Sequence, residues 1–529
     1  MYDLIMLQEG EAVQFILDSL VCRSLLRLFQ ILANVWKESA IYNLYRRVMK
    51  RCSCVLKASS FVRVICRQSG TIAQAWSNSL FCRFLSGLIN LPAAALHRLY
   101  RKFKSVWDGS TLMSVVYFLG ENTPILLGWL LLLFMNIPYE IWNNGYPLIS
   151  GVLLILLIIA AGMRRSSLRL DIMSIGPYVL AFFVAAALSW PSSLYPSDSA
   201  RFLLYFISCA LCILIVVSTA EKEDSLERLA GFGCLGMLGT AVYGVIQRIQ
   251  GVEVDEMLVD VSLNPDMPGR IFSFYENPNS FAVLLVLLIP VAVGLFLGAG
   301  KKFWRVVGLV SALFGAFALI MSYSRACWGG LAFAAVVFVF MWNRKLIPAL
   351  IVVCIVAIPF LPSAILTRIL TIFNSNDTSI ASRVPLYEAA LKMISIRPVA
   401  GAGLGTDAVR HAITELGLYL GTNDYVHSHN TFLEIWLETG LLGLLTFLAS
   451  MVHAVKRGIK ACSLPSTSQP MRLLTIGCIS GLCGSLLSGL VDYIWSYPRV
   501  MFIFWFVAAL LLAAIKLSAP AQNKLQHTN

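Results

Sequence analysis

The chain has 529 residues, of which 58% are hydrophobic and only 13% charged, and its mean hydropathy is +0.76. A soluble domain carries about 25% charged residues, so this composition excludes a soluble globular protein and predicts a polytopic membrane protein. The formal net charge is +13, and most of it lies before residue 110. The thirteen cysteines do not predict a disulfide framework, because nearly all of those after residue 110 fall within apolar runs.

Residues 1–110 form a basic region with fifteen Lys and Arg against six Asp and Glu. Apolar residues recur between the cations at helical spacing, as in residues 25–29 and 61–65. This pattern favours helices on the anionic inner leaflet of a membrane, and it lacks the features of a cleavable signal peptide. Nucleic-acid binding is the competing interpretation, but no recognition motif accompanies the charge, so no nucleic-acid partner is expected. A cytoplasmic partner of this region stays an open alternative.

About twelve apolar runs are long enough to span a membrane, which takes about 17–25 residues per helix. They cover residues 122–138, 145–163, 174–190, 201–218, 229–249, 279–298, 304–322, 326–342, 346–362, 432–453, 473–491 and 496–516. The sequence therefore predicts an all-α polytopic membrane protein. Its expected parts are the basic helical region 1–110, transmembrane helices 1–9 in residues 111–362, a long loop with short helices in residues 363–431, and transmembrane helices 10–12 with a short tail in residues 432–529.

The orientation follows from Lys and Arg, because short loops rich in these residues stay in the cytoplasm. Alternate gaps between the runs hold Arg164, Arg165 and Arg169, then Lys301, Lys302 and Arg305, then Arg344 and Lys345, then Lys456, Arg457, Lys460 and Arg472. The intervening gaps near residues 139–144, 191–200 and 490–495 hold almost none. Both termini are therefore predicted to be cytoplasmic, and the 363–431 loop to be extracytoplasmic.

Three arginines fall on the predicted outer side, where cations are expected to be scarce. Arg270 precedes a span, Arg325 sits in a tight turn between two spans, and Arg383 begins an amphipathic segment. The apolar residues expected on one face of that segment are Tyr387, Leu391 and Ile394. Snorkelling is the alternative interpretation, above all for Arg383. Charges at a membrane edge are nevertheless candidate functional residues, and converging guanidinium groups favour a phosphate-bearing ligand.

Residues 425–434 contain two of the six histidines, His427 and His429, directly before an apolar helix. Histidine changes charge near neutral pH, so either one is a candidate general base. A metal site would need two further ligands, and Asp424 and Glu434 are available, but their spacing matches no standard site. A purely structural pair at the start of the helix is the other alternative. Spacing alone does not decide which histidine acts.

A glycine-rich run lies at residues 401–405. A dinucleotide site is excluded here because no strand precedes the run. A flexible turn between two surface helices is the favoured interpretation, although its backbone N–H groups could still meet an anion.

Together these motifs resemble the O-antigen ligase superfamily, which includes lipopolysaccharide O-antigen ligases, O-antigen polymerases and protein O-oligosaccharyltransferases. The resemblance covers about residues 120–516 and rests on the order and spacing of the motifs. These are Gly-Arg-x-x-Ser-Phe from residue 269, Asn-Pro-Asn from 277, Ser-Arg from 324, Arg383, Gly-x-Gly-x-Gly from 401, His-Ser-His-Asn-Thr-Phe-Leu-Glu from 427 and Gly-Leu-Leu-Gly from 440. The basic first 110 residues depart from the family pattern.

The resemblance implies an inverting, metal-independent glycosyltransferase of the GT-C kind in the bacterial cytoplasmic (inner) membrane. Its partners would be membrane lipid, a donor glycan on undecaprenyl pyrophosphate, and a hydroxyl acceptor on a glycan or glycolipid at the extracytoplasmic face. The implied donor-binding residues are Arg270, Arg325 and Arg383, the implied general base is His429, and the implied supporting residues are His427, Asn430, Asn277 and Asn279. No cofactor and no metal are expected, because the leaving pyrophosphate needs only positive charge and the acceptor only a base.

Two other functions stay open. A polymerase that joins lipid-linked repeats would use the same donor, and a ligase is favoured because the histidine-asparagine element and the 363–431 loop look ligase-like. A transporter of lipid-linked sugars or small solutes would place polar residues within the spans and often shows internal repeats. Here the distinctive residues gather on one side, and no internal repeat is evident.

Overall fold

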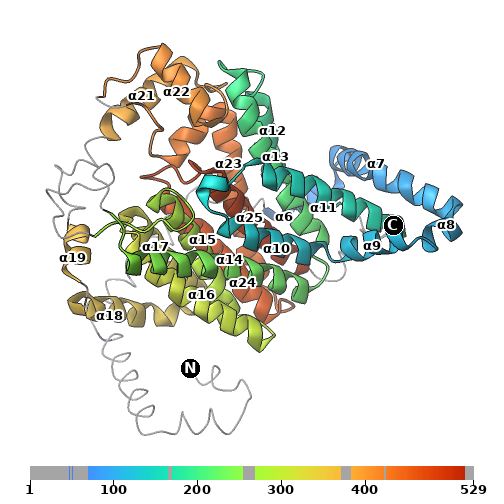
Figure 1. Cartoon of the computed structure of the whole chain (residues 1–529), viewed down its shortest axis with the longest axis horizontal. Helices are drawn as coiled ribbons and strands as arrows, with labels where there is room; N and C mark the ends of the chain where they lie inside the picture. Colours follow the sequence, from blue (N-terminus) through green and yellow to red (C-terminus); the bar gives the residue numbers. More distant parts are fainter. Residues whose placement is uncertain are drawn as a thin grey trace, which may run out of the picture. The chain divides into compact units, whose positions relative to one another are not determined.

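The computed structural model describes residues 69–164, 170–253, 268–360, 362–370, 383–421 and 424–518, together with residues 38, 47 and 51 (Figure 1). Every regular element in these ranges is a helix, so the all-α prediction is confirmed. The amphipathic patterns at residues 25–29 and 61–65 lie outside the described residues. The chain divides into a small unit, residues 1–68 and 345–356, and a large unit that holds the remaining residues. All site residues belong to the large unit.

The helices of the first half of the chain are α6 (Ser69–Asn78), α7 (Leu80–Lys102), α8 (Lys104–Asp108), α9 (Thr111–Glu121), α10 (Thr123–Asn136), η1 (Tyr139–Ile141), α11 (Gly145–Arg164), α12 (Pro177–Ser189), α13 (Pro196–Thr219) and α14 (Glu223–Gln250). Those of the second half are α15 (Pro278–Gly298), α16 (Lys302–Met321), α17 (Arg325–Asn343), η2 (Arg344–Leu346), α18 (Ile347–Ala357), η3 (Ile358–Phe360), α19 (Ser363–Leu370), α21 (Arg383–Ile396), α22 (Gly405–Glu415), α23 (Thr431–Ser463), α24 (Gln469–Ser488) and α25 (Pro498–Leu517).

Ten described helices are long and apolar enough to cross a membrane, or eleven if the bent pair α9 and α10 forms one span. Nine of the ten coincide with predicted spans. The tenth is α7, which the sequence interpretation assigned to the membrane surface. This helix packs against α11, and its Asn90 exchanges hydrogen bonds with the backbone of Leu170. Its length and composition therefore permit a span as well as a surface position.

Three predicted spans differ in detail. The run at 122–138 forms α10, only 14 residues long and bent by 68° from α9, because the chain breaks at Asn122 before Pro124. The run at 174–190 forms α12, which has 13 residues because Gly176 takes a positive φ and Pro177 begins the helix. The run at 346–362 is not a separate span-length helix: its first part, α18, has 11 residues and belongs to a helical run, Arg325–Val356, that begins with α17.

The centre of the large unit is formed by α15, α24 and α25, which are buried along most of their length (Figure 1). Glycines let α15 and α24 approach closely. A Cβ on Gly294 would lie 2.6 Å from the carbonyl oxygen of Leu473, and one on Gly477 would lie 2.6 Å from that of Pro290. Such small-residue contacts are the usual way to pack membrane helices, where burial of apolar surface gives little driving force.

The loops that carry most of the candidate residues meet at one end of these helices, here called the site end. Thr431 at the start of α23 donates its N–H to Gly489 O (2.8 Å) after α24. Ser488 Oγ donates to Ala326 O (3.0 Å) at the start of α17. The loop before α15 therefore also belongs here, since Ile271 N–H donates to Met321 O (3.4 Å) at the end of α16.

The opposite end, here called the basic end, gathers the cations used in the charge argument. Lys301 forms an ion pair with Asp224 (2.7 Å), and Lys516 forms one with Asp171 (2.9 Å). The helices alternate between the two ends, so the site end and the basic end face opposite sides of any membrane that the helices span. Which end is cytoplasmic stays a prediction from the charge bias.

Helices α21 and α22 lie beside the outer parts of α12, α13 and α23 (Figure 1). The glycine run at 401–405 is the turn between α21 and α22, and it is pressed against neighbours: a Cβ on Gly403 would overlap Ser193 Oγ, and one on Gly405 would overlap the Phe202 ring. The expected apolar face of α21 was partly wrong. Ile394 is buried but Leu391 is 53% exposed, because the helix packs through Leu386, Ala389, Ala390, Met393 and Ile394 instead.

Candidate active site

The segment before α23 is held in a defined shape by its own side chains. Asn430 caps the helix, with Oδ1 accepting from the N–H groups of Phe432 (2.9 Å) and Leu433 (3.1 Å). Ser428 donates its backbone N–H (2.8 Å) and its hydroxyl (2.6 Å) to Glu434 Oε2, one turn into the helix. His429 lies between these two anchors with φ of 45°, a left-handed conformation that is uncommon for a residue with a side chain.

A second loop, residues 489–494 between α24 and α25, is joined to this segment. Thr431 Oγ1 donates to Asp492 O (2.9 Å) and accepts from the N–H of Ile494 (3.0 Å). Asn430 Nδ2 donates to Leu490 O (2.9 Å). Two loops that are about sixty residues apart in the sequence therefore form one rigid unit.

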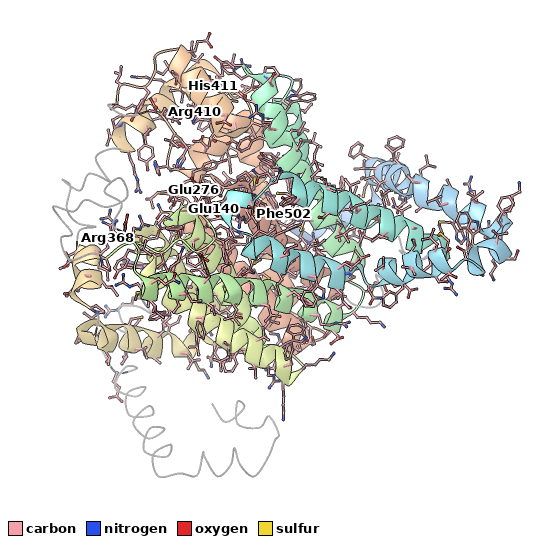
Figure 2. All side chains as sticks on the ribbon, viewed as in Figure 1. Glu140, Glu276, Arg368, Arg410, His411 and Phe502 are labelled. Carbon is pink, nitrogen blue, oxygen red and sulfur yellow. The ribbon has the colours of Figure 1, made fainter. Side chains whose placement is uncertain are left out.

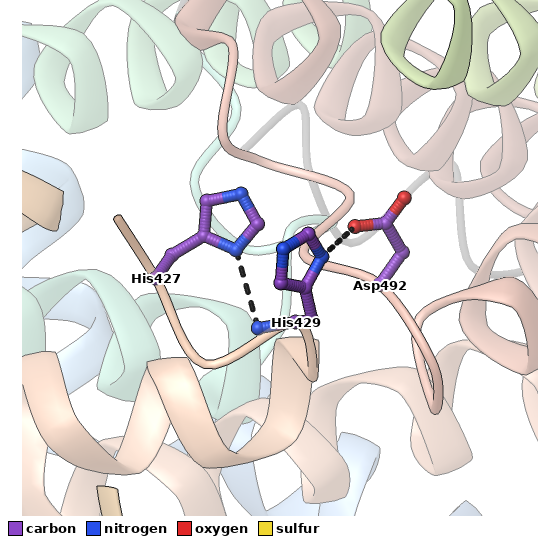
Figure 3. A group of neighbouring side chains, drawn as sticks. All are labelled: His427, His429 and Asp492. Carbon is purple, nitrogen blue, oxygen red and sulfur yellow. Dashed lines mark hydrogen bonds and ion pairs between the residues drawn. The ribbon is translucent and has the colours of Figure 1, made fainter. Parts of the chain in front are cut away.

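This junction brings Asp492 to His429 (Figure 3). The two side chains meet at 3.0 Å between Nδ1 and Oδ1, and Asp492 Oδ1 also accepts from the N–H of Tyr493 (2.9 Å). Burial opposes ionisation of the carboxyl group, but the hydrogen bond from His429 and the positive charges of His429 and Arg383 outweigh it and hold the pKa of Asp492 well below its usual range. An ionised Asp492 accepts the Nδ1 proton of His429, which leaves Nε2 of His429 as a free base.

His427 has a different role in the geometry. Its Nδ1 accepts the backbone N–H of His429 (3.2 Å), and the two rings lie 4.2 Å apart (Figure 3). Burial, together with the charge of His429, lowers the pKa of His427 to about 3. His427 is therefore neutral near physiological pH and supports the backbone that carries His429.

Only one described group of His, Cys, Asp and Glu side chains is compact enough to be a metal-ligand set, and it consists of His427, His429 and Asp492, whose ligand atoms lie within 4.8 Å of one another. Two nitrogens of this group already have partners, His427 Nδ1 in the bond from the His429 N–H and His429 Nδ1 in the pair with Asp492. A metal bound through these nitrogens would have to displace both interactions. The donor set as arranged fits a hydrogen-bonded base better than a metal centre.

Arg270 is almost fully buried at the site end, with 7% of its surface exposed. Its Nε donates to Ser322 O (2.8 Å), and its Nη2 donates to Asn279 Oδ1. Asn277 caps α15 by accepting the N–H of Asn279 (2.7 Å), so the two asparagines fix the helix start that orients Arg270. Burial, and then the charge of Arg368, lower the pKa of Arg270 to about 10, so it stays cationic at neutral pH.

Arg325 and Arg383 complete the predicted set. Arg325 is the first residue of α17, where a cation opposes the helix dipole, and its charge acts on Arg270. Arg383 begins α21, and its charge acts on Asp492 and His427. The same helix reaches the histidine loop directly, since Tyr387 donates its hydroxyl to His429 O (3.4 Å). Electrostatic interactions thus link Arg270 and Arg383 to Asp492, and Arg325 to Arg270.

Three neighbours of the site were missed by the sequence interpretation: Asp492, Glu434 as the partner of Ser428, and Arg368. A signal existed for the first, because Asp492 is the one charged residue in the short apolar gap at 490–495. Glu434 was considered only as a metal ligand. The position of Arg368 could not be inferred, because it depends on the packing of α19.

Parts of the chain are similar to known proteins. Residues 309–448 match the family model described as O-antigen ligase. The exopolysaccharide production protein ExoQ of Rhizobium meliloti is 22% identical over 295 residues, which are 52% of this chain and 64% of that protein. An uncharacterized protein of Haemophilus influenzae is 24% identical over 288 residues, which are 49% of this chain and 71% of that protein. The predicted resemblance to the O-antigen ligase superfamily is thus confirmed over residues 309–448.

The O-antigen ligase match contains Arg325, Arg383, His427 and His429, whereas Arg270 and Asp492 lie outside it. The matched region spans less than two thirds of the length of the Rhizobium protein. The site as a whole therefore rests on the packing of α15, α17, α23 and the 489–494 loop, rather than on the family match alone.

Proposed function

We propose that the chain is an inverting membrane glycosyltransferase that moves a glycan from an undecaprenyl-pyrophosphate carrier to a hydroxyl acceptor at the extracytoplasmic face of the bacterial inner membrane, as an O-antigen ligase does. The match of residues 309–448 to the O-antigen ligase family supports this reaction class. The observation that carries it is the pair of His429 and Asp492 in the same buried region as Arg270.

On the acceptor side, His429 Nε2 removes the proton from the acceptor hydroxyl as that oxygen attacks the anomeric carbon of the donor glycan. Asp492 holds the proton on Nδ1 and stabilises the imidazolium that forms. The bond from the anomeric carbon to the carrier phosphate breaks, and its electron pair leaves with the pyrophosphate. One displacement from the opposite face inverts the anomeric centre.

On the donor side, the leaving group is already a good one, and positive charge is what it requires. Arg270 and Arg325 are proposed to bind the pyrophosphate, since guanidinium groups hold phosphate through paired hydrogen bonds. Arg383 is proposed to contribute from the histidine side. The backbone conformation of the surrounding loops supports this assignment. The four described non-glycine residues with positive φ are Ser273, Glu276, Tyr323 and His429, and all of them lie in loops of the site.

The direct test is transfer by the purified protein in detergent or proteoliposomes, with a lipid-pyrophosphate glycan and a glycan or glycolipid acceptor. Wild-type protein is expected to form product, and His429→Ala is expected to form none while retaining its thermal unfolding midpoint. A transporter would instead keep its substrate flux in His429→Ala. Incubation with EDTA is expected to leave transfer unchanged; loss of activity that Zn²⁺ restores would overturn the metal-independent mechanism.

A polymerase that joins lipid-linked repeats is the second candidate, and the similarity to a protein named for exopolysaccharide production favours keeping it. Removal of the protein from its host separates the two. Long glycan that accumulates on the lipid carrier indicates a ligase, whereas anchors that carry a single repeat indicate a polymerase. An unchanged surface glycan would contradict both.

A further inference from the structure

The helix α19 brings another arginine to the turn that carries Arg325. Ile365 and Arg368 are both buried and lie three residues apart, so they share one face of α19. Arg368 has only 4% of its surface exposed, which is unusual for an arginine. Figure 2 labels it at α19.

That face of α19 packs on the turn between α16 and α17. Ile365 and Ile369 form a cluster with Tyr323 and Trp328, the residues that flank Arg325 in the sequence. Trp328 is fixed in turn by the bond from its Nε1 to Leu319 O (2.9 Å). The packing therefore holds Arg368 beside the same turn whose Ser322 carbonyl accepts from Arg270.

Three guanidinium groups from three separate segments thus gather around residues 322–325. Electrostatics agree with this proximity: after burial, the charge of Arg368 is the strongest influence on the pKa of Arg270, and Arg325 acts in the same direction. Asp492 acts in the opposite direction, but it is also paired with His429. An anion with several oxygen atoms can accept charge-assisted hydrogen bonds from more than one of these guanidinium groups.

We propose that Arg368 is a third arginine of the site that binds the pyrophosphate of the lipid-linked donor, beside Arg270 and Arg325. This assignment rests on the proposed function. It also assigns a role to part of the 363–431 loop, because α19 would contact the donor while α21 contacts the loop that carries His429. Three guanidinium groups match a leaving pyrophosphate better than two, since its charge increases as the glycosidic bond breaks.

The test measures binding apart from transfer, by titration of inorganic pyrophosphate into the purified full chain in detergent. Arg368→Gln is expected to weaken binding by about tenfold or more, because it removes a charge-assisted contact. Arg368→Lys is expected to bind with intermediate affinity, since it keeps the charge without the paired donors. Arg410→Gln is the matched control: Arg410 is exposed on α22 and pairs with Asp407 (2.8 Å).

Wild-type affinity for pyrophosphate in Arg368→Gln would overturn the inference, and so would a wild-type protein that binds no pyrophosphate at millimolar concentration. A merely structural Arg368 would lower the thermal unfolding midpoint in both variants without changing the affinity of the folded protein. If Arg368→Gln does not fold, Arg368→Lys decides alone. If pyrophosphate binds as expected but no glycan is transferred, the proposed function fails. If glycan is transferred and the KM for the donor is unchanged in the Arg368 variants, only the inference about Arg368 fails.

Discussion

The large unit contains two His–Asp pairs of nearly the same geometry. His429 meets Asp492 at 3.0 Å in the loop junction, and His411 of α22 meets Asp198 of α13 at 2.8 Å. The histidine is 30% exposed in the first pair and 49% in the second. Distance alone therefore does not identify the base.

The surroundings separate the two pairs. Asp492 is buried, accepts a second hydrogen bond from the Tyr493 N–H, and lies within electrostatic reach of Arg383 and Arg270. His411 packs its ring 5.3 Å from Tyr195 near the surface (Figure 2). The pair proposed to be catalytic therefore differs from the other by a carboxylate that is kept ionised in a buried setting and by the arginines near it.

The largest effect is expected from the two histidines. His429→Ala should lower the rate of glycan transfer by about a thousandfold or more, because it removes the base. His411→Ala should stay within about twofold of wild type. Both rates come from product formation in proteoliposomes with equal amounts of folded protein. Comparable losses of transfer rate in His429→Ala and His411→Ala would show that both pairs only stabilise the fold.

The two carboxylates sharpen the comparison further. Asp492→Asn should lower kcat by about a hundredfold, because an amide no longer stabilises the imidazolium and does not select the Nδ1–H tautomer. The KM for the acceptor should change little. Asp198→Asn should leave both parameters near wild type. An Asp492→Asn enzyme with wild-type kcat would remove the carboxylate from the mechanism.

The sequence alone predicted most of the fold because apolar length and charge bias act locally. Nine span-length helices were predicted where the structure has them. The errors at α10, α12 and α18 come from breaks at Asn122 and Gly176 and from the joining of α18 to α17, which depend on backbone conformation. Helix α7 is long and apolar enough to span a membrane, and its surface position stays a prediction.

For the site, the sequence identified residues that stand out by their type, namely the outer arginines and His429. It could not identify Asp492 as the partner, because a contact across about sixty residues depends on how α23 and α24 pack. Arg368 was missed for the same reason. The sequence also could not divide the tasks of His427 and His429, which follow from which nitrogen accepts which N–H.

A smaller effect is expected from the anchor of the histidine loop. Ser428→Ala removes the hydroxyl that donates to Glu434 (2.6 Å) but keeps the backbone N–H bond, so His429 should lose part of its fixed orientation. We expect kcat to fall by about tenfold, in line with one lost hydrogen bond to a buried carboxyl group. The control is Ser395→Ala on the exposed face of α21, whose hydroxyl donates only to its own helix. Equal kcat values in the two variants would contradict the positioning role.

The smallest effect concerns His427 and appears in stability rather than rate. Burial lowers its pKa to about 3, so the folded protein cannot protonate it near pH 5, whereas the unfolded chain does so below about pH 6.5. The neutral form of His427 therefore costs the folded protein no stability above about pH 6.5. The free energy of unfolding falls as the pH falls towards 3, by about 2 kcal/mol at pH 5.

His427→Gln removes this titration, so its thermal unfolding midpoint in detergent should fall less than that of wild type between pH 7.5 and pH 5. An equal fall of the midpoint in His427→Gln and wild type would show that the burial of His427 does not contribute to this pH dependence.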